Sequence, residues 1–154
     1  MEYEHQTTEF KHYPAVSENG ESQLTIAVGP VIIEDGKVLL DKHGKDKFWK
    51  FPGGKYVDLF SFPENAKREA REELGIEIKI FGEPFIYQFE RNHEGVPEYV
   101  VLVHYYAKRV IIERIKPGRD IRKCDWFDID KLPKDCAPNI EPAVKHFKKM
   151  LKDK

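Results

Sequence analysis

Three glutamates, Glu69, Glu72 and Glu73, lie close together near the end of a helix expected over residues 62–74. Their i, i+3 and i+4 spacing places the three carboxylates on one face of that helix. Like charges at this spacing repel by about 0.2–0.5 kcal/mol per pair, and carboxylates in a last turn also oppose the helix dipole. A hard divalent cation would convert this repulsion into coordination, because such cations take oxygen ligands. The alternative is a solvated helix face on which neighbouring arginines offset the acids.

A glycine turn just upstream favours the cation interpretation. The turn reads Pro52, Gly53, Gly54, Lys55. Glycines let a backbone carbonyl or amide approach a metal or a phosphate without obstruction by a Cβ atom. Lys55 is placed to meet a phosphate, although a solvated lysine also fits. Hydrolysis of a magnesium-bound diphosphate would need such an acidic cluster beside such a turn.

The same residues resemble the box of the Nudix hydrolases, G-x5-E-x7-R-E-U-x-E-E-x-G-U, in which U is aliphatic. The match runs from Gly54 to Ile76, and a looser likeness to MutT-type members extends over residues 23–152. One position departs from the pattern, because Phe60 stands where the first box glutamate is expected. This departure leaves open a second interpretation, a catalytically weak or inactive Nudix-like nucleotide-binding module.

The resemblance implies a Mg²⁺-dependent pyrophosphohydrolase, with Mn²⁺ as an alternative cation, acting on a nucleotide. It would cleave the diphosphate bond of a nucleoside triphosphate or of another nucleoside diphosphate derivative. Markers of the family's NADH, ADP-ribose and dinucleoside polyphosphate subgroups are absent after the box, so elimination favours a triphosphate. The aromatic residues Trp49, Tyr87 and Phe89 could stack on a base, although aromatics in strands more often belong to the core.

Motif position also implies roles for individual residues. Glu69 is the box candidate for the general base, and Arg68 would orient it through a charge-assisted hydrogen bond. The implied catalytic residues are Arg68, Glu69, Glu72 and Glu73. The implied metal ligands are Gly53 through its carbonyl, Glu69, Glu72, Glu73 and Glu113, the last as an extra carboxylate beyond the box. The candidate substrate-binding residues are Lys55 and Asn139, and Asn139 is also a good N-cap for the last helix.

Hydrophobic periodicity and turn residues predict the elements that hold these side chains. Strands are expected over residues 24–33, 38–40, 48–54, 76–90, 99–110 and 122–129, with a connection over 91–97. The strand over 48–54 is short, aromatic and broken by Pro52 and the two glycines after it. Asp35-Gly36 predicts a two-residue hairpin turn, Ser61 predicts the start of the helix over 62–74, and Gly75 predicts its end. A final amphipathic helix follows Asn139. This order predicts an α/β fold with a mixed sheet flanked by helices, and the resemblance implies a Nudix-type α/β/α sandwich.

Composition and charge indicate the general class of the protein and its expected partners. The chain has 154 residues, of which 40% are hydrophobic and 34% are charged, as expected for one globular domain. A net charge of −1 gives no basic excess, so neither a nucleic-acid polymer nor a membrane surface is an expected partner. No long apolar run, no secretory signal and only two cysteines predict a cytoplasmic protein without a disulfide scaffold. Residues 1–22 are expected to form a polar arm and residues 23–154 a single Nudix domain, with a homodimer left open.

Overall fold

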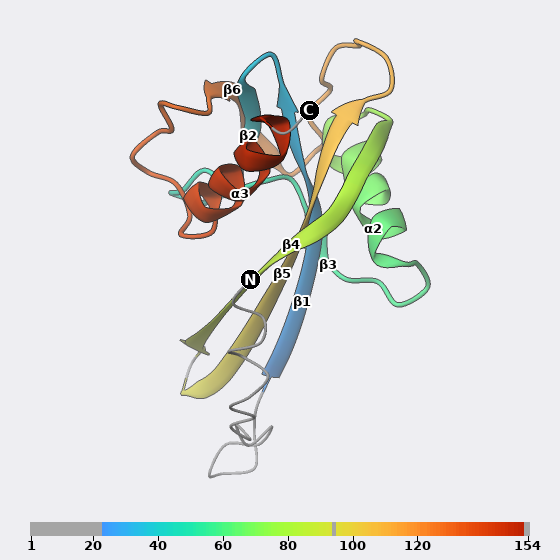
Figure 1. Ribbon diagram of the computed structural model, residues 1–154. Coiled ribbons are helices and arrows are strands. Elements are labelled where there is room, and N and C mark those ends of the chain that lie inside the picture. The colour runs from blue at the N-terminus through green and yellow to red at the C-terminus, as the bar shows by residue number, and fades with distance from the viewer. Residues whose placement is uncertain (1–22, 94, 153–154) are drawn as a thin grey trace.

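The computed structural model describes residues 23–93 and 95–152, and the expected arm over residues 1–22 lies outside them (Figure 1). In chain order, the elements are β1 (Gln23–Glu34), β2 (Lys37–His43), β3 (Gly54–Lys55), α2 (Phe62–Glu69), the π-helix η1 (Ala70–Leu74), β4 (Ile78–His93), β5 (Val96–Arg109), β6 (Ile121–Asp128) and α3 (Ile140–Lys152). None of the helices in these ranges is long and apolar enough to cross a membrane.

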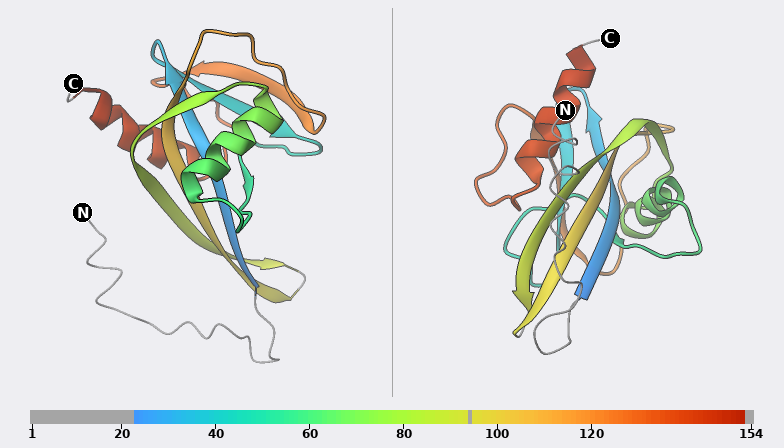
Figure 2. Two further views of the ribbon diagram at one scale, coloured as in Figure 1. Left: turned by 90° about the vertical axis from the view of Figure 1, so that its right-hand side faces the viewer. Right: turned by 60° about the horizontal axis from the view of Figure 1, so that its bottom comes forward.

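The strands form one mixed sheet with the order β4-β5-β1-β2-β6, and the short β3 pairs with β1. β1 and β5 are parallel, whereas the other neighbouring strands are antiparallel. The helix α2 covers one face of the sheet, and α3 lies against the other face (Figures 1 and 2). The predicted mixed sheet between helical layers is therefore confirmed.

The run Val31-Ile32-Ile33 in β1 is apolar throughout because both faces of the sheet are covered. Successive side chains of a strand point to opposite faces. Val31 and Ile33 pack in a cluster with Phe147 of α3, while Ile32 packs in a second cluster with Leu74 of η1. The sheet thus lies between two separate parts of the core, and the helix that carries the box glutamates is fixed to one of them.

The turn between β1 and β2 has the predicted hairpin chemistry. Asp35 has a φ of 52° and Gly36 a φ of 73°, so both central residues adopt the positive φ that a type I′ turn requires. This turn matches the right-handed twist of the two strands. The predicted hairpin is therefore confirmed.

The short aromatic strand expected over residues 48–54, with its break at Pro52 and the two glycines, is wrong as a strand. This segment makes only isolated bridges, Asp41 with Lys50 and Trp49 with Cys136, before the two-residue β3. Pro52 has no N–H to donate to a ladder, and Gly53 has a φ of 154°, so a regular strand cannot pass through them.

The long β4–β5 hairpin extends beyond its predicted ends. β4 continues to His93 and β5 begins at Val96, although residues 91–97 were expected to be a connection. Asn92 Oδ1 accepts a hydrogen bond from the Gly95 N–H at 2.7 Å. The turn is therefore formed by the few residues around this hydrogen bond and does not occupy the whole segment. The remaining residues continue the ladder.

The helix over residues 62–74 has the predicted ends but not the predicted interior. Ser61 accepts the Glu64 N–H at 3.2 Å, and Gly75 ends the helix with a φ of 65°. The last turn, Ala70–Leu74, is a π-helix and not a continuation of α2. Because a π turn holds one more residue than an α turn, it changes where Glu73 points relative to Glu69. Such insertions are frequent at functional sites.

Candidate active site

Glu69 is held inside the molecule with its carboxylate against Arg68. Its side chain is almost fully buried, and its Oε1 accepts a hydrogen bond from Arg68 Nη2 at 2.9 Å. Burial raises the pKa of Glu69, and the Arg68 charge opposes that shift. Arg68 therefore fixes the direction of this carboxylate, as motif position implied.

The glycine turn makes room for Glu69. A Cβ added to Gly54 would lie 2.6 Å from Glu69 Oε1. The pairing of Val28 in β1 with Gly54 in β3 places this backbone beside the helix. A side chain at residue 54 would therefore displace the carboxylate, which is the close approach that the sequence predicted for this turn.

Glu73 links the π turn to the glycine turn by a hydrogen bond. Its Oε2 accepts the Gly53 N–H at 2.8 Å. Burial raises the pKa of Glu73 to about 8, against an ordinary value of 4.5. A positive charge on His43 opposes this shift.

Glu72 lies on the outer side of this group. Its side chain is 59% exposed, and its Oε2 accepts a hydrogen bond from Arg68 Nη1 at 2.9 Å. Arg68 thus contacts two of the three box carboxylates, Glu69 and Glu72. The structure brings Gly53, Glu69, Glu72 and Glu73 together, with two carboxylates directed inward and one toward solvent.

Asn65 is a positioning residue that the sequence analysis missed. The residue is fully buried, and its Oδ1 accepts the Val57 N–H at 3.0 Å and Arg68 Nη2 at 3.2 Å. The Phe60 ring, 41% exposed, lies 6.0 Å from the guanidinium carbon of Arg68. Arg68 therefore has an amide and an aromatic ring beside it, and Phe60 brings no carboxylate. The signal available in the sequence was a polar residue, Asn65, one helical turn before Arg68 on the same side of the helix.

The two substrate-binding candidates lie in different surroundings. Lys55 is exposed next to the glycine turn. Asn139 is buried, with its Nδ2 2.9 Å from His104 Nε2 in β5. Burial lowers the pKa of His104 to about 4, so its neutral ring accepts this hydrogen bond. The side chain of Asn139 is therefore bonded to His104, while its backbone carbonyl accepts the Ala143 N–H at the start of α3.

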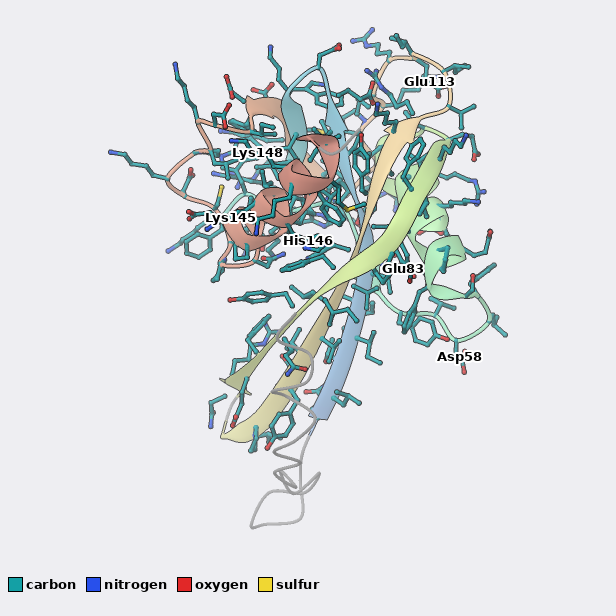
Figure 3. The ribbon with its side chains drawn as sticks, viewed as in Figure 1. Asp58, Glu83, Glu113, Lys145, His146 and Lys148 are labelled. Carbon is teal, nitrogen blue, oxygen red and sulfur yellow. The ribbon has the colours of Figure 1, made fainter. Side chains whose placement is uncertain are left out.

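Glu113 belongs to a segment that contacts the π turn, since the Gly118 N–H donates to the Glu73 carbonyl at 2.8 Å. It lies in the segment after β5, at one end of the sheet (Figure 3). Its backbone carbonyl accepts a hydrogen bond from Arg109 Nη1 at 2.6 Å. Among the residues that the structure describes, no hydrogen bond or ion pair joins the Glu113 side chain to Glu69, Glu72 or Glu73. Glu113 as a metal ligand therefore stays a prediction from the resemblance.

Two residues of β2 complete the surroundings of Glu73. His43 Nε2 lies 3.0 Å from Asp41 Oδ1 and 3.6 Å from Glu73 Oε1. Burial raises the pKa of Asp41, and the contact with Asp41 raises the pKa of His43. The signal in the sequence is Asp41, a charged residue directly after the apolar run Val38–Leu40. Asp41 and His43 were not among the predicted site residues.

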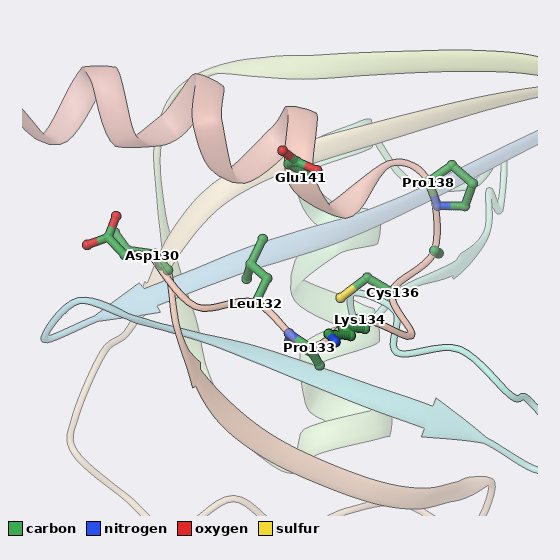
Figure 4. Close-up of a pocket in the computed structure, with 9 residues that line it drawn as sticks. Asp130, Leu132, Pro133, Lys134, Cys136, Pro138 and Glu141 are labelled. Carbon is green, nitrogen blue, oxygen red and sulfur yellow. The ribbon is translucent and has the colours of Figure 1, made fainter.

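A cavity elsewhere on the molecule does not belong to this group. It has a volume of about 490 Å³ and lies between the segment after β6 and the start of α3 (Figure 4). Leu132, Cys136 and Glu141 are among its lining residues, and none of the predicted site residues lines it. Since α2 and α3 lie on opposite faces of the sheet, the box carboxylates are on the other side.

Comparisons with known proteins identify the family and the fold. The family model of the NUDIX domain matches residues 23–149. The ADP-ribose pyrophosphatase of Methanocaldococcus jannaschii is 29% identical over 126 residues, which cover 79% of this chain and 72% of that protein. A MutT Nudix hydrolase structure from Burkholderia pseudomallei has a TM-score of 0.65 at 24% identity, covering 80% of this chain and 98% of that one. A C. elegans Ap4A hydrolase structure has a TM-score of 0.69 at 19% identity, covering 84% and 99%. At these identities the two structures support the fold alone.

Proposed function

Since the chain belongs to the Nudix family of hydrolases, we propose that it is a Mg²⁺-dependent pyrophosphohydrolase acting on a nucleoside triphosphate or another nucleoside diphosphate derivative. One observation carries this proposal. Glu69 is buried and Glu73 is partly buried against the Gly53–Gly54 turn, where no side chain can separate them from the backbone. Buried carboxylates at such a turn are suited to hold a cation that a diphosphate also contacts.

The residues present fit a hard divalent cation. The inward-facing groups offer oxygen ligands to such a cation. The positively charged side chain of Arg68 donates hydrogen bonds to Glu69 and Glu72. Burial raises the pKa values of Glu69 and Glu73 because it disfavours their charged forms, and a bound cation would favour those charged forms. The proposed ligands are the Gly53 carbonyl, Glu69, Glu72 and Glu73. When bound, Mg²⁺ would neutralise diphosphate charge and acidify a water molecule.

The protein's own groups would then act as follows. Glu69 accepts the proton of the attacking water. Its pKa is raised by burial, which makes the carboxylate a stronger base. Arg68 positions Glu69 through the hydrogen bond to Oε1. Lys55, exposed beside the turn, meets a phosphate of the substrate. Asn139 is the proposed contact for the base, and it would reach a ligand only by sharing or releasing its bond to His104.

The substrate class follows from two lines of support that differ in detail. The relative from M. jannaschii is an ADP-ribose pyrophosphatase, whereas the missing subgroup markers after the box favour a nucleoside triphosphate. Both substrates contain a nucleoside diphosphate, so the proposal rests on that shared chemistry. A direct comparison of the two decides between them.

A Mg²⁺-supported screen of nucleoside triphosphates, ADP-ribose, nucleotide sugars and dinucleoside polyphosphates tests the proposal. We expect hydrolysis by the parent protein and a loss of about 100-fold or more in Glu73→Gln, which removes a charged ligand. Glu77→Gln is the matched control, because Glu77 lies just beyond the helix and pairs with Arg71 at the surface. Equal rates for the parent and Glu73→Gln would remove the site assignment.

The Phe60 position separates the active enzyme from the binding module. Phe60→Glu places a carboxylate near Arg68, where the family pattern has one. A rise in kcat would show that Phe60 limits turnover. Binding of nucleotide by the parent without measurable hydrolysis of any substrate would select the inactive module instead.

A further inference from the structure

Asp41 and His43 share one face of β2 with Leu39. Alternate residues of a strand point to the same side of the sheet. Leu39 packs in the cluster that includes Ala70 and Leu74 of η1. Asp41 and His43 therefore continue from the core toward the end of the π turn, where Glu73 lies.

Asp41 is an unusual residue for this position. It is 0% exposed, and neither of its carboxylate oxygens receives a hydrogen bond. A buried carboxylate without hydrogen bonds is costly unless a charge of opposite sign compensates it. His43 Nε2 lies 3.0 Å from Oδ1, which makes an ion pair when the imidazole is protonated and leaves Oδ2 without a partner.

Glu73 adds a third donor atom to this pair. Its Oε2 is used by the Gly53 N–H, while its Oε1 faces His43 Nε2 at 3.6 Å. One donor atom from each of Asp41, His43 and Glu73 lies within 4.8 Å of the other two. Two oxygens and one nitrogen therefore converge on a single small volume.

Lys50, whose charge acts on Asp41, is engaged elsewhere, because its Nζ pairs with Asp46 Oδ2 at 2.9 Å. A cation held between the three side chains would use the oxygens of Asp41 that lack hydrogen bonds.

We propose that Asp41, His43 and Glu73 form a second divalent-cation site, which prefers a transition-metal ion such as Mn²⁺, Co²⁺ or Zn²⁺ to Mg²⁺. An imidazole nitrogen suits these ions, whereas Mg²⁺ favours oxygen ligands alone. Glu73 is shared with the proposed catalytic group. Any effect of the second site on hydrolysis therefore rests on the proposed function, but cation binding does not.

Cobalt alone is the probe for this site. The full-length protein, freed of metal by chelation, is titrated with Co²⁺ while visible absorption and bound metal are measured. We expect Asp41→Asn and His43→Gln to lose at least about tenfold in Co²⁺ affinity. His43→Gln should also lose the absorption that reports nitrogen ligation, whereas Asp41→Asn should change its intensity. The matched controls Asp46→Asn and His146→Gln should behave as the parent, since Asp46 pairs with Lys50 and His146 lies on α3.

Further measurements distinguish a loss of cation binding from a loss of folding and from a loss of hydrolysis. Circular dichroism confirms the fold of each variant, and His43→Gln decides the matter if Asp41→Asn is unfolded, because His43 is partly exposed. Glu72→Gln should weaken Mg²⁺-supported hydrolysis but keep the Co²⁺ spectrum. If the proposed function fails, the Co²⁺ spectrum should still be present. A folded His43→Gln with the parent's Co²⁺ affinity and absorption would overturn the second site.

Discussion

Asn65→Ala tests how the loop before α2 positions Arg68. The Asn65 amide is buried, and its Oδ1 accepts hydrogen bonds from Val57 N–H at 3.0 Å and Arg68 Nη2 at 3.2 Å. Its Nδ2 donates to the carbonyls of Val57, Phe60 and Ser61 at 3.1, 3.2 and 2.9 Å. One side chain therefore joins the loop, the helix start and the arginine.

The cost of the substitution follows from these contacts. Alanine leaves the Val57 N–H without its partner, which costs about 1–3 kcal/mol, and the lost amide leaves a small cavity. We expect the free energy of unfolding to fall by about 2–4 kcal/mol. For a chain of 154 residues this corresponds to a decrease in Tm of about 4–16 °C.

Urea and thermal unfolding of the metal-free protein measure this change. Asn92→Ala is the matched control, because Asn92 is exposed and its Oδ1 accepts one hydrogen bond, from the Gly95 N–H. We expect the control to lose less than about 1 kcal/mol. At a temperature where both variants are folded, Asn65→Ala should also lower kcat more than it raises KM, since Arg68 loses a contact that holds it toward Glu69. A Tm of Asn65→Ala equal to that of the parent would refute the reasoning.

Two further predictions concern the carboxylates. Gly54→Ala should lower kcat/KM by about 10–100-fold, because its Cβ would lie 2.6 Å from Glu69 Oε1; a parent-like value in steady-state assays would contradict this packing. Burial raises the pKa of Glu73 from 4.5 to about 8, so between these values the folded protein holds a proton that the unfolded chain releases. The metal-free protein should therefore melt at a lower temperature at pH 8.5 than at pH 6. Mg²⁺ should raise Tm more at the higher pH. Thermal scans with Glu73→Gln should show a smaller difference between the two pH values, and an unchanged difference would count against the assignment.

Local chemistry made several elements predictable. Asp35-Gly36 tolerates positive φ, so the hairpin between β1 and β2 followed from two residues. Ser61 and Gly75 satisfy orphan backbone groups at the helix ends, which placed those ends correctly. The box glutamates were found in the same way, because their spacing within one helix is itself a local property.

Other features depended on which segments meet. The expected strand over residues 48–54 fails because its backbone follows the edge of β2 and turns at Pro52 and Gly53 toward β1. No periodicity within that segment reports such a path. The π turn is likewise invisible to a pattern of apolar residues, since it depends on how η1 packs against the sheet.

The amino-acid sequence by itself determined the family, the helix that carries the acids and the glycine turn beside it, because each depends on residues close together in the chain. Only the tertiary structure decided that Glu69 and Glu73 face inward while Glu72 faces solvent. It also decided that Asp41 and His43 of β2 lie against Glu73. The physical reason is that these contacts arise from the docking of a helix on a sheet, which joins residues whose separation in the sequence carries no signal of their proximity.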